Sequence, residues 1–464
     1  MAMNEFDALG FNRRDFLKSG SFATLMTMMG GVELVAAEPE KPADTAVAGA
    51  KVKVAVIGLG AWGREIVKTL SGLTQANIAA ICDTYAPSLR RAASTAPGAA
   101  QVPDYKAILD NKDISAVVVA TPTHKHKEIV LAALKAGKHV YCEAPLAHTI
   151  EDAREIAAAA KANPQRLFQP GLQIRCDPQR HFLLPFIRAG NIGKPFMARA
   201  QWHKKISWRT ASSNPEQEKA LNWRLDKTTS IGLIGEIGIH QIDQASWFLN
   251  ARPKAITGFG SIAYWNKDNR DAPDDRDVPD TVQAIIEFPG GTRMIYDATL
   301  ANSFDAAYEM YYGGYAAVVL REDKAWMLKE TDSPLFDWEV YAPREKFYDS
   351  TGIALIAGHS KAGVSAPAGK EKKEAPLTYT ESLLKKTFIN FVDRCAAIDL
   401  FVADFGTDGK VNPTDLQENL AQAHLDPVPT YLDGYYATVT AIKANEAIMS
   451  GSRIEIKPEW YELA

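Results

Sequence analysis

The 464-residue sequence is poor in cysteine, has little net charge and contains no long hydrophobic run. Its four cysteines, at positions 82, 142, 176 and 395, form no Cys-x-x-Cys pair and are expected to be buried thiols rather than a disulfide framework. The formal charge of −4 comes without a long basic stretch, which disfavours nucleic acid as a partner. With 46% hydrophobic and 23% charged residues, the chain has enough apolar material for about two domains.

The N-terminal segment resembles a twin-arginine export signal. The stretch "NRRDFLKSGSF" at 12–22 contains an arginine pair, and a short, mildly apolar run then leads to a small-residue cleavage site that ends at Ala37. The run is shorter than the roughly 20 residues needed to span a bilayer. We therefore expect a signal peptide at 1–37, a linker at 38–50, and export of the folded protein by the twin-arginine machinery to the periplasm or another extracytoplasmic site. An amphipathic N-terminal helix, which Glu33 would suit, is the alternative.

A glycine-rich turn follows the first expected strand. The stretch "KVKVAVIGLGAWGREIVKTL" at 51–70 alternates valines and then places Gly58, Gly60 and Gly63 before an amphipathic helical pattern. In this context the first glycine permits a tight turn, the second lets the backbone approach a pyrophosphate, and the third lets the helix pack on the strand. The pattern predicts a dinucleotide-binding fold, with a ligand-free glycine turn as the alternative.

An acidic residue stands where such a fold recognises the ribose. The next expected strand, "NIAAICD" at 77–83, ends in Asp83, about twenty residues after the glycines, where a carboxylate binds ribose hydroxyls. Its charge would repel a 2′-phosphate, and the arginines Arg90 and Arg91 follow only after a helical stretch. NAD is therefore favoured over NADP.

The α/β alternation continues beyond this strand. Strands are expected at 114–120 and 138–142, between Ala- and Leu-rich helical patterns, and they end in "ATPTH" and "CEAP". Because ligands bind at the carboxyl edge of a parallel sheet, both turns are expected to face the ligand.

Later stretches have a different pattern. Residues 253–265, 281–300 and 306–323 read as successive strands joined by glycine-rich turns. This predicts an antiparallel meander in a second domain.

Five motifs occur in one order across residues 51–300: "GLGAWG", "ATPTHKH", "EAP" at 143–145, "GLQIRCDP" at 171–178 and "GEIGIHQIDQASWFL" at 235–249. With them the chain resembles the Gfo/Idh/MocA family of sugar-handling oxidoreductases. The resemblance implies a Rossmann dinucleotide-binding domain at 51–173, followed at 174–464 by an α/β domain with a large, open, mostly antiparallel sheet. The exposed face of that sheet commonly forms dimers or tetramers in the family, so a homo-oligomer is expected.

Besides the three glycines and Asp83, five residues are expected to contact the cofactor: Thr121, Pro122, His126, Glu143 and Pro145.

The resemblance also exposes a departure at Ala144. In the family this motif usually reads Glu-Lys-Pro, and its Lys works with an acidic residue and a His four positions later in proton transfer. By matching positions, Glu236 takes the acidic role and His240 that of the base, on one helix face because i and i+4 align. Three possibilities stay open: His240 acts alone, Lys204 or Lys205 substitutes, or the net reaction is not a simple dehydrogenation. A structural histidine at this position is the alternative.

The expected function is an exported NAD-dependent oxidoreductase that acts on a sugar with a tightly held cofactor, since free nicotinamide nucleotide should be scarce outside the cytoplasm. A captive cofactor must be regenerated in place. One route is the closed oxidation and reduction of an NAD-dependent glycosidase, as some relatives perform; the other is a two-substrate exchange, as in exported glucose–fructose oxidoreductases. Outside enzymes, a non-catalytic sugar-binding protein is the alternative.

Aromatic residues beside charged donors suit sugar recognition. Such sets occur in "QWHKKISWR" at 201–209 and "NWRLD" at 222–226, although both tryptophans could equally be packing residues. The residues expected to contact the substrate are Arg175, Trp202, Trp223, Arg224 and Asp243.

One late segment, "DFGTDGKVNPTD" at 404–415, is a weak candidate for a calcium loop. Its potential ligands are Asp404, Asp408, Asn412 and Asp415. Gly406 replaces the usual third-position ligand, so a polar turn between helices is the preferred interpretation and no resident metal is expected.

Overall fold

The computed structural model describes residues 51–463 except 270–273, 323, 337–338, 340–341, 349, 356–381, 408–410 and 424. The expected signal peptide and linker therefore lie outside the described residues, and so does Asp408 of the candidate calcium loop. Export stays a prediction.

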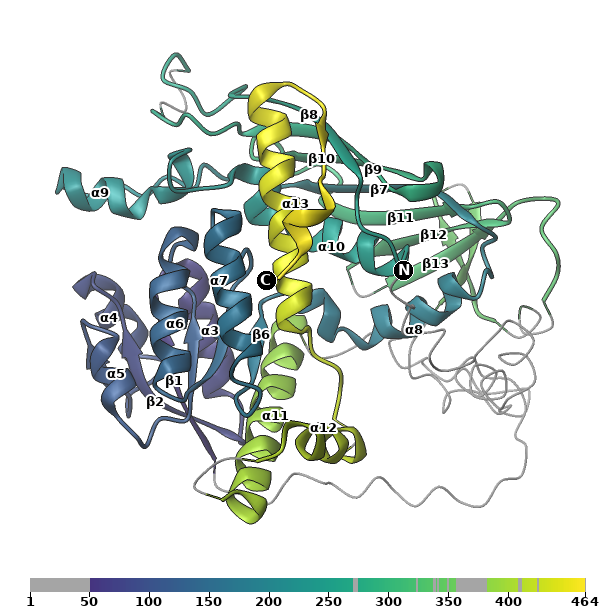
Figure 1. Cartoon of the computed structure of the whole chain (residues 1–464). Coiled ribbons are helices and arrows are strands. Elements are labelled where there is room, and N and C mark those ends of the chain that lie inside the picture. The colour runs from purple at the N-terminus through teal and green to yellow at the C-terminus, as the bar shows by residue number, and fades with distance from the viewer. Residues whose placement is uncertain are drawn as a thin grey trace, which may run out of the picture. The chain divides into compact units, whose positions relative to one another are not determined.

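The first sheet contains six parallel strands in the order β3-β2-β1-β4-β5-β6 (Figure 1). The strands are β1 (Val52–Ile57), β2 (Ala76–Cys82), β3 (Ala100–Val102), β4 (Ala116–Val119), β5 (His139–Cys142) and β6 (Phe168–Pro170). Every residue of β4 and β5 is buried, as expected for strands covered by helices on both faces. Because the strand order reverses at β1, the ends of β1 and β4 flank the crevice where such sheets bind ligands. The predicted doubly wound parallel sheet is confirmed.

The helices that alternate with these strands are α3 (Ala61–Ser71), α4 (Ala86–Ala93), α5 (Lys106–Asp110), α6 (His126–Lys135) and α7 (Ile150–Lys161). In α3 the buried residues Ile66, Val67 and Leu70 recur at helical spacing, which gives the helix one apolar face toward the sheet.

Two C-terminal helices, α11 (Leu383–Phe405) and α12 (Pro413–Gln422), belong to the hydrophobic core of this first sheet. Phe388 and Phe391 of α11 are fully buried, and their ring centroids lie 4.8 and 5.8 Å from that of Tyr141 on β5. The domain boundary expected after residue 173 assigns both helices to the second domain. In the structure they pack with the nucleotide-binding strands instead.

The second sheet has ten strands in the order β14-β15-β13-β12-β11-β7-β10-β9-β8-β16. They are β7 (Pro195–His203), β8 (Ala255–Ser261), β9 (Thr281–Glu287), β10 (Arg293–Thr299), β11 (Ala307–Gly313), β12 (Ala316–Arg321), β13 (Lys324–Lys329), β14 (Arg344–Phe347), β15 (Ser350–Ala354) and β16 (Ile454–Glu455). The pairings of β8 with β9, β9 with β10 and β11 with β12 are antiparallel, which confirms the predicted meander for residues 253–300. The predicted succession is wrong at the next step, because β7 lies between β10 and β11.

Alternation in β9 and β10 gives the sheet two unlike faces. Val282, Ala284 and Ile286 are buried, whereas Ile285 is 45% exposed and pairs across the strands with Ile295, which is 39% exposed. Helix α13 (Tyr431–Ser450) packs against β8 and β9. The outer face of these strands is therefore mixed, with Ile285 and Ile295 between polar residues such as Gln283 and Arg293.

Two compact units make up the chain. One contains Pro178–Arg199, which includes α8 (Pro178–Arg188), and the described part of Ala307–Thr380; the other contains the described parts of Thr45–Asp177, Ala200–Ala306 and Glu381–Ala464. All candidate site residues lie in the second of these units.

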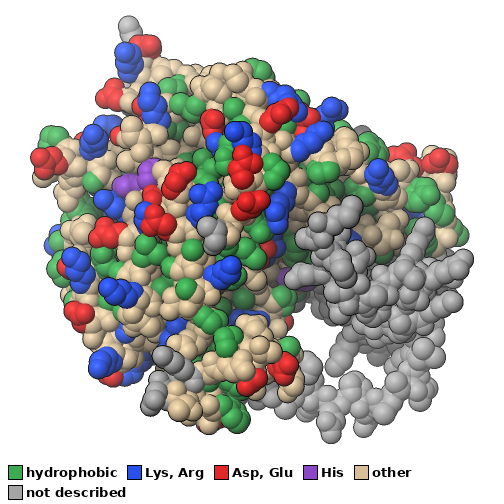
Figure 2. Space-filling view, viewed as in Figure 1, with side chains coloured by type: hydrophobic (Ala, Val, Ile, Leu, Met, Phe, Trp, Pro, Cys, Tyr) green, Lys and Arg blue, Asp and Glu red, His purple; other side chains and the backbone are tan. Residues whose placement is uncertain are grey.

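Charged side chains of both signs are interspersed on the face shown in Figure 2, in keeping with the absence of a basic stretch in the sequence. Among the helices that the structure describes, none has the length and apolarity needed to cross a membrane.

Candidate active site

The glycine turn after β1 lies directly against the turn after β4. Gly58 has a φ of +95°, and a Cβ there would lie 2.6 Å from the carbonyl carbon of Ala120, so only glycine fits. A Cβ at Gly63 would collide with the Gly58 carbonyl oxygen, whereas nothing lies within 4 Å of one at Gly60. The three glycines thus have the expected geometry: a tight turn, an open approach for a ligand at the N-terminus of α3, and close packing of helix on strand.

Asp83 is tied to that turn. Its Oδ2 accepts a 2.7 Å hydrogen bond from the Leu59 backbone N–H, and its Oδ1 accepts one of 2.7 Å from Tyr85 N–H. The partly exposed carboxylate is therefore fixed beside the glycine turn. Its recognition of ribose stays a prediction.

His126 joins the turns after β4 and β5. Its side chain is buried, with Nε2 2.9 Å from the Thr121 carbonyl oxygen and Nδ1 3.0 Å from that of Pro145. Burial lowers its pKa to about 4. Both ring nitrogens face backbone oxygens, so His126 holds in place the turns that carry Thr121, Pro122 and the cis bond between Ala144 and Pro145.

Glu143 is a buried carboxyl at the end of β5. It accepts a 2.9 Å hydrogen bond from Nε1 of Trp62 in the first turn of α3, a contact that sequence reasoning missed. Burial raises its pKa to about 7, although the hydrogen bond from Trp62 opposes this rise. A Cβ at Gly171 would lie 2.6 Å from Glu143 Oε2, so the carboxyl is closely packed. The sequence did show a tryptophan inside the glycine-rich motif "GLGAWG", and this residue is Trp62.

Glu236 lies in a π-helical turn, Ile234–Gly238, that precedes α10 (Ile239–Phe248). A π-helical turn of this kind is typical of functional sites. The i, i+4 α-helical spacing expected between Glu236 and His240 is interrupted, because Glu236 lies in this π-helical turn and α10 begins only at Ile239. Glycine has low helix propensity, and Gly235 and Gly238 stand where a Cβ would meet the side chains of Ile231 and Tyr296.

Hydrogen bonds surround the buried Glu236 carboxyl. Thr123 Oγ1, from the turn after β4, donates a 3.0 Å bond to Oε2, and Ser230 Oγ donates one of 3.3 Å to Oε1. Burial raises the pKa of Glu236, opposed first by the positive charge of Arg224. The Thr123 bond joins the acidic residue of the helix to the edge of the nucleotide-binding sheet.

His240 follows in the first turn of α10 and is partly exposed. Burial lowers its pKa to about 4, so the imidazole is neutral at neutral pH. Within the described residues its ring has no hydrogen-bond partner. A neutral imidazole without a protein partner is suited to accept a proton from a ligand.

Arg175 and Asp243, both expected at the substrate, bind one another. Arg175 Nε and Nη2 donate bonds of 2.7 and 2.9 Å to the two Asp243 oxygens, and Nη1 lies 2.8 Å from Asp433 Oδ1. The Asp243 side chain is 5% exposed. The pair anchors α10 one turn beyond His240, and any contact of either residue with substrate stays a prediction.

Trp223 and Arg224 lie beside Glu236. The Arg224 guanidinium is 4.6 Å from the Trp223 ring centroid and 5.7 Å from that of Trp208. Its Nε lies 4.0 Å from Glu236 Oε2. The structure thus brings aromatic faces and a cation to the acidic residue, as sugar recognition needs. Trp202, on β7, is partly buried and has no ring contact with this cluster in the part of the chain described.

The two lysines considered as substitutes for Ala144 are exposed. Lys205 Nζ lies 5.0 Å from the Tyr264 ring centroid, and Lys204 is held through its backbone N–H by the Thr299 carbonyl oxygen. Neither contacts Glu236 or His240 among the described residues.

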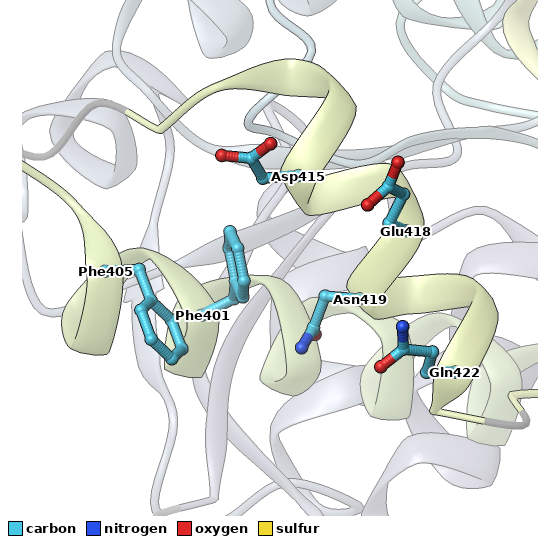
Figure 3. A pocket seen from close by; sticks show the side chains of 6 residues that line it. All are labelled: Phe401, Phe405, Asp415, Glu418, Asn419 and Gln422. Atoms are coloured by element: carbon cyan, nitrogen blue, oxygen red, sulfur yellow. The ribbon is translucent and has the colours of Figure 1, made fainter.

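The candidate calcium loop has structural roles at its described positions. Asn412 caps α12, its side-chain oxygen accepting a 2.9 Å bond from Thr414 N–H. Asp415 lines a surface pocket between α11 and α12, and the rings of Phe401 and Phe405 on the facing helix also line it (Figure 3). The two rings are tilted by 37° to one another, with centroids 5.0 Å apart. No cluster of three metal-ligating side chains occurs in the described ranges.

Two family matches identify the chain. Residues 52–170 match "Oxidoreductase family, NAD-binding Rossmann fold", and residues 185–313 match "GFO/IDH/MocA C-terminal domain", which together make more than half of the sequence. The chain belongs to the Gfo/Idh/MocA family. Its first sheet is accordingly the NAD-binding Rossmann domain of this family.

Related proteins include dehydrogenases of cyclic polyols and sugars. An inositol 2-dehydrogenase of Salmonella paratyphi B is 30% identical over 210 residues, 44% of this chain and 56% of that protein. The chain thus matches little more than half the length of this curated relative. Two solved structures share the fold over 88% of this chain and 100% of theirs: an oxidoreductase domain protein from Kribbella flavida (TM-score 0.63, 21% identity) and a levoglucosan dehydrogenase in complex with NADH and L-sorbose (TM-score 0.61, 20% identity).

Proposed function

We propose that the protein is an NAD-dependent oxidoreductase that acts on a hydroxyl of a sugar or cyclic polyol. The observation that carries the proposal is the 3.0 Å bond from Thr123 to Glu236, which joins the acidic helix of His240 to the ligand-binding edge of the NAD domain. The relatives named above act on inositol or levoglucosan, which favours the same substrate class.

The site residues divide the chemistry between them. When bound at the glycine turn, NAD would supply the acceptor for the hydride that leaves the carbinol carbon of the substrate. His240 takes the hydroxyl proton, because its lowered pKa keeps the ring neutral. The alcohol loses one hydride and one proton and becomes a ketone, so atoms and charges balance. Glu236, held by Thr123 and Ser230, orients the hydroxyl or the imidazole, while Trp223 offers a face to the sugar ring.

The enzyme is further proposed to be exported with its cofactor bound. The twin-arginine-like segment supports this because that route carries folded proteins. A cofactor held outside the cytoplasm is then regenerated by reduction of a second substrate at the same site.

A second candidate is an NAD-dependent glycosidase, and Ala144 favours it. Such an enzyme oxidises a hydroxyl transiently, eliminates the aglycone, adds water and returns the hydride, so the cycle needs no external oxidant. It would release aglycone in deuterated water with deuterium incorporated beside the transiently oxidised carbon. Intact glycosides together with an accumulating ketone would exclude it.

Self-association is proposed through the outer face of β8, β9 and β10. Phe259, Ile285 and Ile295 are 61, 45 and 39% exposed on these adjacent strands. Three large apolar side chains exposed on adjacent strands favour an interaction surface there. Changing Ile285 and Ile295 to Lys should yield a monomer by light scattering, and an unchanged mass would place the interface elsewhere.

The bound nucleotide is the first test of the proposed function. Protein purified from the exported fraction is denatured, and the released small molecules are identified by mass spectrometry. NAD or NADH at near one equivalent per chain is expected. A protein that is empty and also fails to bind added NAD would contradict both the activity and the export of a loaded enzyme.

A further inference from the structure

The candidate site contains two buried carboxyls, and the Glu-Ala-Pro motif at 143–145 provides no positive charge beside them. Glu143 and Glu236 are 9 and 6% exposed, and burial raises the pKa of each. Ala144 contributes no cation at this point, and the exposed Lys204 and Lys205 have no contact with either carboxyl among the described residues. A negative charge developing on a substrate oxygen here would therefore need another source of compensation.

The positive charge of Arg224 interacts electrostatically with both carboxyls. Its charge opposes the rise in pKa at Glu236, where it is the strongest opposing influence, and also at Glu143. Its Nε lies 4.0 Å from Glu236 Oε2, is shielded from solvent, and has no hydrogen-bond partner in the described part of the chain. The side chain as a whole is 41% exposed, so the outer nitrogens remain accessible to a ligand.

Two fixed aromatic rings hold the guanidinium in place. Trp223 is anchored through its carbonyl oxygen, which accepts a 2.7 Å bond from Thr229 Oγ1. Trp208 has a φ of +63°, a left-handed conformation that is strained for a tryptophan and marks a position set by its surroundings. The preceding residue is held by Arg276, which donates to the Ser207 carbonyl oxygen and is itself paired with the buried Asp274.

We infer that Arg224 supplies the positive charge which the Glu-Ala-Pro turn lacks, and that it stabilises the oxyanion formed as His240 removes the hydroxyl proton. This rests on the proposed function. An arginine guanidinium keeps its proton in proteins, so Arg224 neither gives nor takes one. The proton passes to His240 alone, and Arg224 acts by electrostatics and by hydrogen bonds to the substrate oxygen. The absence of a Lys at position 144 left several possibilities for the proton transfer. The inferred role of Arg224 corresponds to the one in which His240 acts alone as the base.

The first test needs no substrate. NMR of isotope-labelled glutamate carboxyl carbons follows the titrations of Glu143 and Glu236, each assigned with its Glu→Gln variant. Arg224→Gln should move both titrations to higher pH, whereas Arg224→Lys should retain most of the wild-type positions. Arg209→Gln is the matched control, because Arg209 follows Trp208 in the chain but pairs with Glu218. Titrations that stay unchanged in Arg224→Gln would overturn the inference.

The second test is kinetic, with NAD and the best polyol or sugar substrate. Arg224→Gln should lower kcat by about 10²–10³-fold, the typical effect of removing one oxyanion donor, with unchanged NAD affinity. Ala144→Lys introduced into Arg224→Gln should recover part of the lost kcat. A variant that raises KM with unaltered kcat would show that Arg224 only binds substrate, and would overturn the inference.

The two tests separate the inference from the proposed function. If Arg224→Gln shifts both glutamate titrations but the wild type oxidises no sugar or polyol, the proposed function is contradicted. The effect of the Arg224 charge on the two carboxyls is then still supported. An active wild type whose Arg224→Gln variant is equally active contradicts the inference alone.

Discussion

Removal of the Asp83 carboxylate should weaken NAD binding and relax the preference over NADP. In Asp83→Ala the ribose loses a charged acceptor, and one hydrogen bond to a charged group contributes about 1.5–3 kcal/mol. NAD affinity should therefore fall about 10- to 150-fold. The same change removes a repulsion of about 1–4 kcal/mol between the carboxylate and a 2′-phosphate about 4 Å away. NADP should then bind as well as before or better.

Calorimetric titration of nucleotide-free protein with NAD and NADP gives both affinities. The variant also loses the bonds from the Leu59 and Tyr85 N–H groups, so its thermal unfolding must be measured beside binding. Asp113→Ala is the matched control, because that carboxylate is 77% exposed and pairs with Lys53 at the surface. A folded Asp83→Ala protein with unaltered selectivity would refute the reasoning, since the adenosine ribose would have to lie elsewhere.

Three further changes probe the acidic helix and the altered turn. His240→Ala should lower kcat by about 10²–10⁴-fold with NAD still bound, and activity within a few-fold of wild type would make His240 structural. Because the pKa of His240 is lowered to about 4, wild-type kcat/KM should hold through mildly acidic pH and fall only near that value; a fall near pH 6.5 would contradict this. Glu236→Gln should have a smaller effect on kcat, as the amide keeps one acceptor for Thr123; a loss equal to that of His240→Ala would make Glu236 itself the proton acceptor. Ala144→Lys should raise sugar-dependent reduction of bound NAD in an oxidoreductase, whereas in a redox-neutral glycosidase the added cation would occupy substrate space and lower aglycone release.

Local signals in the sequence were enough to predict the NAD domain. Gly58, Gly60 and Gly63 lie between a strand and a helix. Their geometry depends on contacts within that turn and with the turn after β4. The meander was predictable for a similar reason, because alternation in 281–300 reports which side of each strand is buried.

Features that depend on distant contacts could not be predicted. The bond from Trp62 to Glu143 joins residues 81 positions apart, and neither residue's neighbours in sequence indicate it. Helix α11 has an apolar pattern that fits either domain, so only the structure shows it on the first sheet. Arg175 and Asp243 each looked suited to a substrate, yet their pairing satisfies both charges within the protein.

Transfer of deuterium from substrate to bound cofactor tests the central claim most directly. Wild-type protein with NAD bound is mixed with sugars and cyclic polyols deuterated at their carbinol carbons, and the nucleotide released on denaturation is analysed by mass spectrometry. We expect deuterium on the nicotinamide ring with at least one substrate, and transfer about 10²–10⁴-fold slower in His240→Ala. Wild-type protein that holds NAD but takes up no deuterium from any sugar, polyol or glycoside would contradict the proposal that this fold carries out sugar oxidation.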